Sequence, residues 1–350
     1  MKLVVPMGGR GTRLRPLSHT TPKALLPVAG TPAIARTLAA FGRALPRPVL
    51  EAVFVLSPED EHTDVPGRLR AICDGLGLQA SFAIQDRPLG TAYAIGSAGD
   101  ALEGEVLTVW SDTLFEPARR AALEDAPDVV AWTVEVEDPR RFGVVARDER
   151  GAVTGLIEKP ADARFRETLI GAYYVRDGTA LRAAIDRMVA SGRTGAGGEY
   201  QLTDALDALV QGGAHLQTEP VAEWLDVGTV PAYLHAVAAV LDRERRALEA
   251  ADPGVGALEG VEIRPPAYVA PDAVVRRSVV GPYASVEAGA VLEGAEVRDA
   301  VVLSGAEVRE SAVTGVVGAR ARVESWSGPV LLGDDASVGL EVVRRSPLEG

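Results

Sequence analysis

The feature that most limits the possible folds is the alternation of strand-like and helix-like segments over residues 1–250. Helices are expected at Pro32–Ala44, Val65–Leu76 and Thr91–Ala101. The segments expected to be strands are Lys2–Pro6, Leu50–Leu56, Ala80–Ile84, Val106–Trp110 and Val129–Val136. This order predicts an α/β domain with a Rossmann-like, mostly parallel sheet and helices on both faces. Ligands of such sheets bind beyond the carboxyl ends of the strands.

A connecting helix over residues 230–250 is expected to follow, because Thr229 and Pro231 are start signals and Asp252-Pro253-Gly254 ends the pattern. The predicted domains are therefore 1–252 and 253–350. In the second domain, aliphatic residues recur at positions 269, 275, 280, 286, 292 and 297. This spacing resembles the hexapeptide repeats of left-handed parallel β-helices, whose short repeats bury their apolar faces by stacking. An irregular antiparallel β domain remains the alternative.

Composition narrows the class of protein. The net charge is −13, and no basic cluster of the kind used for nucleic-acid binding is present. No apolar run approaches the roughly 18 residues that span a bilayer, and the apolar stretch at the start is too short for a signal peptide. Cys73 is the single cysteine, which excludes an internal disulfide. We expect a cytoplasmic enzyme with no nucleic-acid or membrane partner.

Lysine is rare in this chain. Of 36 basic residues, only Lys2, Lys23 and Lys159 are lysines, and the others are arginines. A lysine presents a compact point charge, whereas an arginine presents a planar fork. The two internal lysines, Lys23 and Lys159, are therefore candidates for specific contacts with phosphate.

The segment Val5–Thr31 combines glycines with cations. Gly8, Gly9 and Gly11 allow backbone N–H groups to approach an anion, and nearby arginines and Lys23 add positive charge. The string G-x-x-x-x-G-K-[ST] of the P-loop is absent. The dinucleotide fingerprint also fails, since no acidic residue occurs between Arg10 and Pro46, and a dehydrogenase is not favoured.

The order of residues Gly8–Pro16, followed by Pro22-Lys23, resembles the signature G-G-x-G-T-R-L-x-P…P-K of the nucleotidyltransferases that activate sugar 1-phosphates. One departure is Pro6-Met7, where Leu-Ala is usual. The resemblance implies that Gly8, Gly9, Gly11, Thr12 and Arg13 bind the nucleotide. It also implies that Arg13 and Lys23 are catalytic, because they would neutralise charge on the phosphates during transfer.

The resemblance continues downstream and implies a base site and a metal site. Gln85 would read the base, and Gly90, in Pro88-Leu89-Gly90-Thr91-Ala92, would let the backbone approach it. Asp112 and Asp226, the latter in Trp224-Leu225-Asp226-Val227-Gly228-Thr229, would hold catalytic Mg²⁺. Ser111 departs from the family pattern, in which a glycine precedes the first aspartate.

The same resemblance implies a sugar-phosphate site made of Gly143, Glu158, Lys159, Gly171 and Tyr173. Gly143 would expose an N–H group, Glu158 would accept hydrogen bonds from sugar hydroxyls, and Lys159 would bind the phosphate. The motif Gly198-Glu199-Tyr200-Gln201-Leu202-Thr203-Asp204 and the absence of Asn-Ala-Gly near position 170 favour a pyrimidine nucleotide over GDP-mannose synthesis.

The expected reaction joins dTTP or UTP to glucose 1-phosphate, giving a nucleotide sugar and pyrophosphate by an in-line, Mg²⁺-assisted displacement. A homo-oligomer is expected. Three alternatives stay open: a mannose-1-phosphate guanylyltransferase, a bifunctional N-acetylglucosamine-1-phosphate uridylyltransferase and acetyltransferase, and a non-catalytic regulatory protein. All four histidines precede the repeat, which disfavours acetyl transfer with a histidine base.

Overall fold

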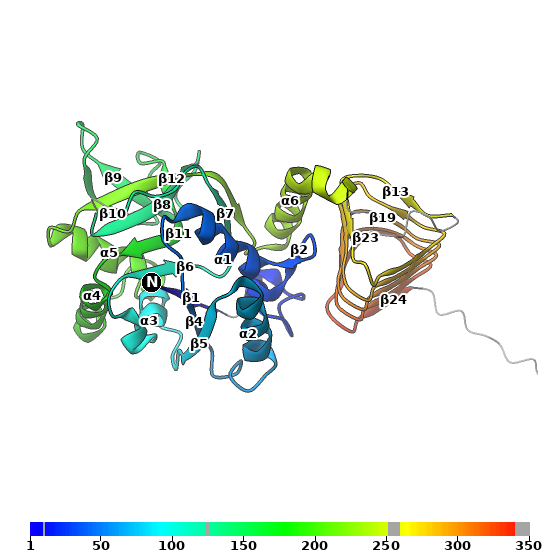
Figure 1. The fold of residues 1–350 in the computed structure, drawn as a ribbon, viewed down its shortest axis with the longest axis horizontal. Helices are drawn as coiled ribbons and strands as arrows, with labels where there is room; N and C mark the ends of the chain where they lie inside the picture. Colours follow the sequence, from blue (N-terminus) through cyan, green and yellow to red (C-terminus); the bar gives the residue numbers. More distant parts are fainter. Residues whose placement is uncertain (10, 124–126, 251–259, 340–350) are drawn as a thin grey trace, which may run out of the picture. The chain divides into compact units, whose positions relative to one another are not determined.

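A computed structural model of the protein describes residues 1–9, 11–123, 127–250 and 260–339 (Figure 1). The chain forms two compact units, and neither is continuous in sequence. The first, here called the sheet unit, comprises Met1–Arg10 and Ala33–Leu225. The second, here called the β-helix unit, comprises Gly11–Pro32 and Asp226–Gly350. The glycine-rich segment is therefore divided between the two units.

The sheet unit is built on one large mixed sheet. Strand β1 (Lys2–Pro6) has a parallel neighbour on each side. Strand β11 (Glu167–Val175) runs antiparallel to β6 (Val106–Val109) and to β8 (Val129–Glu135). The hairpin of β9 (Gly143–Arg147) and β10 (Val153–Glu158) joins at β11. The order across the sheet is β5 (Gln79–Ile84), β4 (Glu51–Leu56), β1 (Lys2–Pro6), β6 (Val106–Val109), β11 (Glu167–Val175), β8 (Val129–Glu135), β12 (Leu216–Asp226) and β7 (Thr113–Pro117).

Helices cover both faces of this sheet, as Figure 1 shows. On one face, Val4 and Ala131 pack in a core with residues of α3 (Thr91–Gly96), α4 (Gly178–Ser191) and α5 (Leu202–Gln211). On the other face, Trp132 meets Phe41 of α1 (Ala33–Ala44) edge to face, with ring centroids 5.6 Å apart. Ala131 and Trp132 are adjacent in β8, so the alternation of strand side chains supplies the two cores.

The predicted strands and helices of this unit are present, with small shifts at their ends. Helix α2 spans Val65–Leu76, as predicted, and ends at Gly77, whose φ is 69°. The helix expected over Thr91–Ala101 is shorter, because α3 ends at Gly96 and a 3₁₀ turn, η3, occupies Gly99–Leu102. Gly99 has a φ of 59°, which a continuous right-handed helix cannot contain.

The C-terminal strands of the β-helix unit wind round an axis in parallel ladders, which confirms the predicted β-helix. Val275, Leu292, Val308, Val323 and Val338 stand in register on successive coils. Their unequal spacing in sequence accommodates the departures from a strict hexapeptide period. The first ladder runs in the order β13 (Glu262–Ile263), β16 (Val279–Val280), β19 (Glu296–Val302), β17 (Ala284–Val286) and β14 (Ala267–Val269). Strand β21 (Ala312–Val317) also pairs with β19, and β23 (Ser327–Leu331) pairs with β21. The second ladder runs in the order β15 (Val274–Arg276), β18 (Val291–Glu293), β20 (Glu307–Arg309), β22 (Arg322–Glu324) and β24 (Ser337–Gly339).

The β-helix unit also contains the predicted connecting helix and a short hairpin. Helix α6 spans Val230–Ala250, and Thr229 caps it, since the Ala232 N–H donates to Thr229 Oγ1 at 3.3 Å. The hairpin consists of β2 (Pro27–Val28) and β3 (Thr31–Pro32). The predicted boundary at residue 253 lies outside the described residues, so the division into 1–252 and 253–350 stays a prediction.

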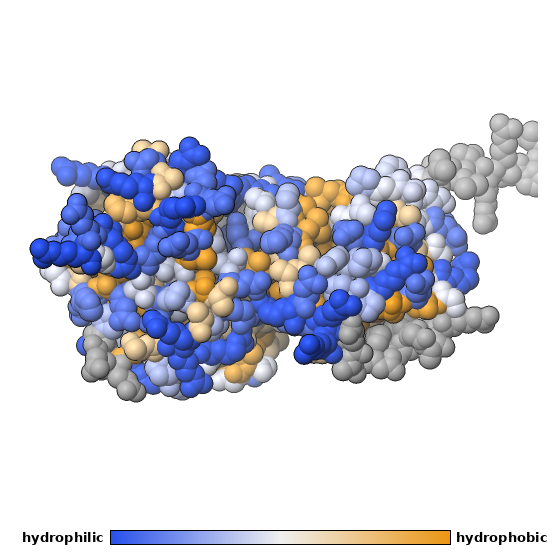
Figure 2. Space-filling view, turned by 90° about the horizontal axis from the view of Figure 1, so that it is seen from above, coloured by the Kyte–Doolittle hydropathy of each residue, from blue (hydrophilic) through white to orange (hydrophobic). Residues whose placement is uncertain are grey.

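The surface is largely polar on the face shown in Figure 2, with apolar side chains in small groups between hydrophilic ones. Among the described helices, none is long and apolar enough to cross a membrane. The Trp326 side chain, in the β-helix, is 37% exposed. The predicted homo-oligomer stays a prediction.

Replacing Leu292 with alanine tests the β-helix core. Leu292 is fully buried, so Leu292→Ala should lower the free energy of unfolding by about 2–5 kcal/mol through lost burial and a residual cavity. Denaturant unfolding followed by circular dichroism measures this change. The control Arg298→Ala, at an exposed position of β19, should change it by at most about 0.5 kcal/mol. Equal, small effects of both would contradict the assigned register.

Candidate active site

The glycine-rich segment begins where β1 ends, and its first glycine makes room for Gln85. A methyl group at Gly8 would lie 2.6 Å from Gln85 Oε1, so the Gln85 amide would have to move from its present position. The Gln85 amide donates from Nε2 to the Arg87 carbonyl at 3.0 Å, and the side chain is only 8% exposed. A methyl group at Gly9, by contrast, would meet no described atom within 4 Å. The structure thus brings two predicted nucleotide-binding residues together and leaves Gly9 open.

The predicted base loop is tied to the segment that leads into α5. Gly90 has a φ of 119°, and a methyl group there would lie 2.5 Å from the Tyr200 carbonyl oxygen. The Ala92 N–H donates to that oxygen, and the Tyr200 N–H donates to the Leu89 carbonyl, both at 2.9 Å. Thr91 Oγ1 accepts from the Leu202 N–H at 2.9 Å. These three hydrogen bonds therefore hold the loop beside the start of α5.

Two residues of the predicted sugar-phosphate site, Gly143 and Glu158, lie together with Thr203. Thr203 Oγ1, in α5, donates to Glu158 Oε2 at 2.7 Å. A methyl group at Gly143 would lie 3.1 Å from the same Glu158 oxygen and 3.0 Å from Thr203 Oγ1. Burial raises the pKa of Glu158 above its usual value, although the bond from Thr203 and the charge of Lys159 oppose this shift. Gly143 thus allows a carboxyl group and a hydroxyl group to approach closely in a poorly hydrated position.

Lys159 follows Glu158 in an uncommon backbone conformation. Its φ is 48°, in the left-handed region that non-glycine residues seldom adopt and that is often found at functional sites. Its Nζ lies 4.0 Å from Glu158 Oε1, and its side chain is 45% exposed. The ammonium group is therefore accessible and remains near the carboxyl group.

Gly171 and Tyr173 occupy less accessible positions. Gly171 has a φ of 82°, and a methyl group there would lie 1.8 Å from Trp110 Cδ1, so this glycine accommodates the Trp110 indole. Tyr173 is 2% exposed. Burial raises the pKa of its hydroxyl well above the usual range, and the charge of Glu158 adds to the rise. Tyr173 is therefore a buried, neutral side chain, and sugar contacts by Gly171 and Tyr173 stay predictions.

The two predicted metal ligands lie at or just after the ends of strands of the large sheet. Asp112 comes after β6, in a turn with the buried Ser111, and is half-buried. Asp226 ends β12, and its Oδ1 accepts from the Gly228 N–H at 2.7 Å. Carboxylates at strand ends fit the oxygen ligands that Mg²⁺ takes together with phosphate oxygens and water. The two residues belong to different units, and their pairing stays a prediction.

The remaining predicted residues belong to the β-helix unit. Gly11 adopts a φ of 56° ahead of the 3₁₀ turn η1 (Thr12–Leu14), and its carbonyl accepts from Ser18 Oγ at 2.7 Å. Thr12 and Arg13 are exposed, whereas Lys23 is half-buried at the start of η2 (Lys23–Leu25). Gly11 lies beside both Ser18 and Lys23, since a methyl group there would contact the Cβ atoms of both.

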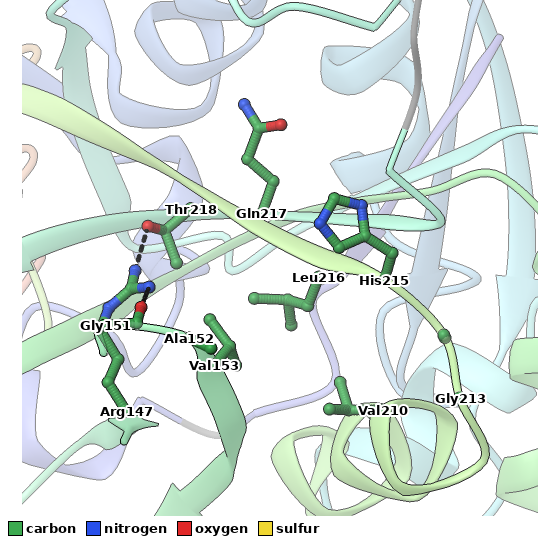
Figure 3. Close-up of a pocket in the computed structure, with 11 residues that line it drawn as sticks. Arg147, Gly151, Ala152, Val153, Val210, Gly213, His215, Leu216, Gln217 and Thr218 are labelled. Carbon is green, nitrogen blue, oxygen red and sulfur yellow. Dashed lines mark hydrogen bonds between the residues drawn. The ribbon is translucent and has the colours of Figure 1, made fainter. Parts of the chain in front are cut away.

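A pocket of about 580 Å³ opens on another part of the sheet unit (Figure 3). Arg147 is the cation at its edge, but its Nε donates to Glu167 Oε2 at 2.7 Å, and its terminal nitrogens donate to the Gly151 carbonyl and to Thr218 Oγ1. Its described lining residues, Arg147, Gly151–Val153, Val210 and Gly213–Thr218, include no predicted site residue. This pocket is distinct from the candidate active site.

Sequence reasoning missed the supporting roles of Thr91, Trp110 and Thr203. Thr203 lies inside a motif recognised from the sequence, but its bond to Glu158 depends on a contact between α5 and β10. Trp110 gave no signal, because its role beside Gly171 depends on the pairing of β6 with β11.

Residues 2–243 match the family model described as nucleotidyl transferase. A glucose-1-phosphate thymidylyltransferase of Streptomyces griseus is 30% identical over 312 residues, which cover 81% of this chain and 82% of that protein. A mannose-1-phosphate guanylyltransferase of Mycobacterium tuberculosis is 33% identical over 196 residues, 53% of this chain and 50% of that protein.

Among solved structures, a UDP-glucose pyrophosphorylase complexed with UDP-glucose has a similar fold. The TM-score is 0.56 at 21% identity, over 69% of this chain and 98% of that one. The family model covers more than half of the chain and includes every residue of the candidate site. The protein therefore belongs to the nucleotidyl transferase family.

Proposed function

We propose that this protein transfers a nucleotidyl group from a nucleoside triphosphate to a sugar 1-phosphate, with release of pyrophosphate. Membership of the nucleotidyl transferase family supports a nucleotidyl group as the group that is transferred. The observation that supports a sugar 1-phosphate as the acceptor is the cluster of Gly143, Glu158 and Thr203 beside Lys159. This cluster offers a carboxylate for hydroxyl groups and an ammonium group for a phosphate. A sugar 1-phosphate presents both kinds of group.

The proposed reaction is an in-line displacement. A phosphate oxygen of the sugar 1-phosphate attacks the α-phosphorus of the triphosphate, a new P–O bond forms, and the bond to the pyrophosphate leaving group breaks. The attacking oxygen is already anionic, so no general base is needed. Catalysis would come from positioning and from neutralisation of charge by Arg13, Lys23 and Lys159. Mg²⁺ held by Asp112 and Asp226 would supply further positive charge at the phosphates.

The proposed substrates are glucose 1-phosphate and dTTP or UTP. The name of the Streptomyces griseus relative, with which most of the chain aligns, supports this choice. The guanylyltransferase relative aligns over about half of the chain, so mannose 1-phosphate with GTP is the second candidate. A cytoplasmic location remains a prediction from the sequence, and bifunctional acetyl transfer remains an alternative that the positions of the histidines disfavour.

The test is pyrophosphate release from purified protein with Mg²⁺, crossed over the common nucleoside triphosphates and several sugar 1-phosphates. We expect release that requires both substrates, fastest with glucose 1-phosphate and a pyrimidine nucleotide. Fastest release with GTP and mannose 1-phosphate would move the assignment to the second candidate. Nucleotide binding with no release in any combination would favour the regulatory alternative.

Replacing Glu158 with glutamine tests its role in sugar binding separately from its effect on the stability of the fold. Burial raises the pKa of Glu158, so its ionised form costs stability once pH rises through the folded-state pKa. Glu158→Gln should therefore not lower the free energy of unfolding at pH 7. The loss of a charged acceptor for sugar hydroxyls should raise KM for the sugar 1-phosphate roughly tenfold or more, with KM for the nucleotide within about twofold.

Glu167→Gln is the matched control, because Glu167 is a half-buried carboxylate outside the candidate site. Burial alone would raise the pKa of Glu167, but hydrogen bonds from Arg147 and Thr218 outweigh it and hold the pKa below its usual value. Its ionised form therefore stabilises the fold above the unfolded-state pKa, and this stability is lost as pH falls. Glu167→Gln should be less stable at pH 7 and keep a normal sugar KM. An unchanged sugar KM in Glu158→Gln would exclude Glu158 from the sugar site.

Replacing Asp226 with asparagine tests the metal site. An asparagine oxygen can still accept from the Gly228 N–H, so Asp226→Asn should fold normally. Loss of the charge should reduce turnover with Mg²⁺ on the order of a hundredfold. The control is Asp177→Asn, where Asp177 accepts from the Ala180 N–H at the start of α4. Turnover in Asp226→Asn equal to that of the control would remove Asp226 from the metal site.

A further inference from the structure

The segment Gly11–Pro32, here called the signature loop, belongs to the same compact unit as α6 and the β-helix. It carries Arg13 and Lys23, the cations assigned to the phosphates. The contacts within this unit show what holds the loop in place.

The hairpin at the end of the signature loop is held first by α6. Tyr233 is fully buried, and its hydroxyl donates to the Pro27 carbonyl at 2.6 Å. Burial raises the pKa of Tyr233 well above its usual value, so it remains a neutral donor. The buried hydroxyl and the carbonyl satisfy each other, which fixes the first strand of the hairpin against the helix.

The β-helix holds the turn of the same hairpin. Gly30 has a φ of 78°, and a methyl group there would lie 2.2 Å from Tyr268 Cζ, so the turn packs directly on this ring. The Gly30 N–H donates to Glu287 Oε1 at 3.3 Å, and Ser285 Oγ donates to the same oxygen at 2.7 Å. Glu287 is only 4% exposed. A carboxyl group so deeply buried is costly unless hydrogen bonds compensate, and one of these bonds comes from the loop.

The β-helix makes a second contact nearer the middle of the signature loop. Thr20 Oγ1 donates to Asp334 Oδ2, while Asp334 Oδ1 accepts from the Ala319 N–H at 2.8 Å. A methyl group at Gly333 would lie 3.0 Å from Pro16 Cβ, so the backbone of this coil also packs on the loop. Lys23 therefore lies between two places where the β-helix contacts the loop.

The path from the hairpin to Lys23 is short and ordered by hydrogen bonds. The Leu26 N–H donates to the Lys23 carbonyl at 3.2 Å, and the Leu25 N–H donates to the Pro22 carbonyl at 2.8 Å. Ala24, Leu25 and Leu26 are all buried, and Leu26 directly precedes Pro27. A shift of the hairpin would therefore move the backbone of Lys23.

We propose that Glu287 of the β-helix is a positioning residue for the transferase reaction, which fixes the hairpin and through it Lys23. The β-helix is then part of the catalytic apparatus, rather than only a structural cap or an oligomerisation module. The proposal rests on the proposed function, because it assigns Lys23 to the phosphates.

The first test compares Glu287→Ala with the matched variant Glu293→Ala in the full chain. Glu293 is also a β-helix carboxylate, but its partners are Arg277 and Arg309, outside the signature loop. Glu287→Ala should lower kcat roughly tenfold and leave KM for the sugar 1-phosphate within about twofold, because Glu158 and Lys159 lie in the sheet unit. Glu293→Ala should leave both within about twofold.

Tyr233→Phe is the second variant, because it keeps the buried ring and removes only the bond to Pro27. It should lower kcat about threefold with the same unchanged sugar KM. If both variants keep kcat within twofold of the wild type, the proposal is wrong. A rise in sugar KM equal to the fall in kcat would also overturn it, since it would place the effect at the sugar site rather than at Lys23. Loss of folded protein would lower apparent kcat without changing KM, so kcat is expressed per folded protein, measured by circular dichroism.

Amide hydrogen exchange supplies a readout that does not depend on activity. Exchange at Leu25, Leu26 and Gly30 should accelerate about tenfold in Glu287→Ala and remain unchanged in Glu293→Ala. A wild-type protein with no transferase activity would contradict the proposed function, and exchange alone would then test the anchoring. Unchanged exchange in Glu287→Ala would overturn the role of Glu287, whatever the activity.

Discussion

Strand β1 is the element on which the arrangement of the sheet unit depends. It lies between parallel strands β4 and β6, and Leu3, Val4 and Val5 have no exposed surface. Its position is therefore determined on both edges and both faces. The Met7 N–H continues the pairing by donating to the Val55 carbonyl at 2.8 Å, and the chain then becomes glycine-rich. A rigid strand thus presents a backbone with few side chains at the edge where ligands of parallel sheets bind.

Close approach is the common role of four glycines in the candidate site. Gly8 admits Gln85, Gly90 admits the Tyr200 carbonyl, Gly143 admits Glu158 and Thr203, and Gly171 admits the Trp110 indole. Each contact brings a polar or aromatic group closer to the backbone than a Cβ atom would allow. The resulting site buries Glu158, whose raised pKa shows that this placement opposes its ionisation. A binding function explains why a carboxyl group would be kept where it does not stabilise the fold.

Much of the fold was predictable, because strand and helix periods and the valine repeat are local signals. Helix α2 and the β-helix ladders followed the sequence pattern directly. The motifs predicted roles for Gly8, Gln85, Glu158 and Lys159, but gave no sign of the groups that contact them. Thr203 reaches Glu158 only because α5 packs on β10, and Glu287 reaches Gly30 across 257 positions of sequence. Such contacts depend on tertiary packing, which carries no periodic signal. The antiparallel entry of β11 into the sheet was missed for the same reason.

The most direct test follows the α-phosphate of the nucleotide. Purified protein would be incubated with Mg²⁺, glucose 1-phosphate and a pyrimidine nucleoside triphosphate labelled with ¹⁸O on the α-phosphorus. Mass spectrometry would then identify the products that contain the label. The account predicts that the label appears in a nucleotide sugar, in equal amount to the pyrophosphate released. Label found only in a nucleoside monophosphate, or pyrophosphate formed at the same rate without the sugar phosphate, would contradict transfer to a sugar.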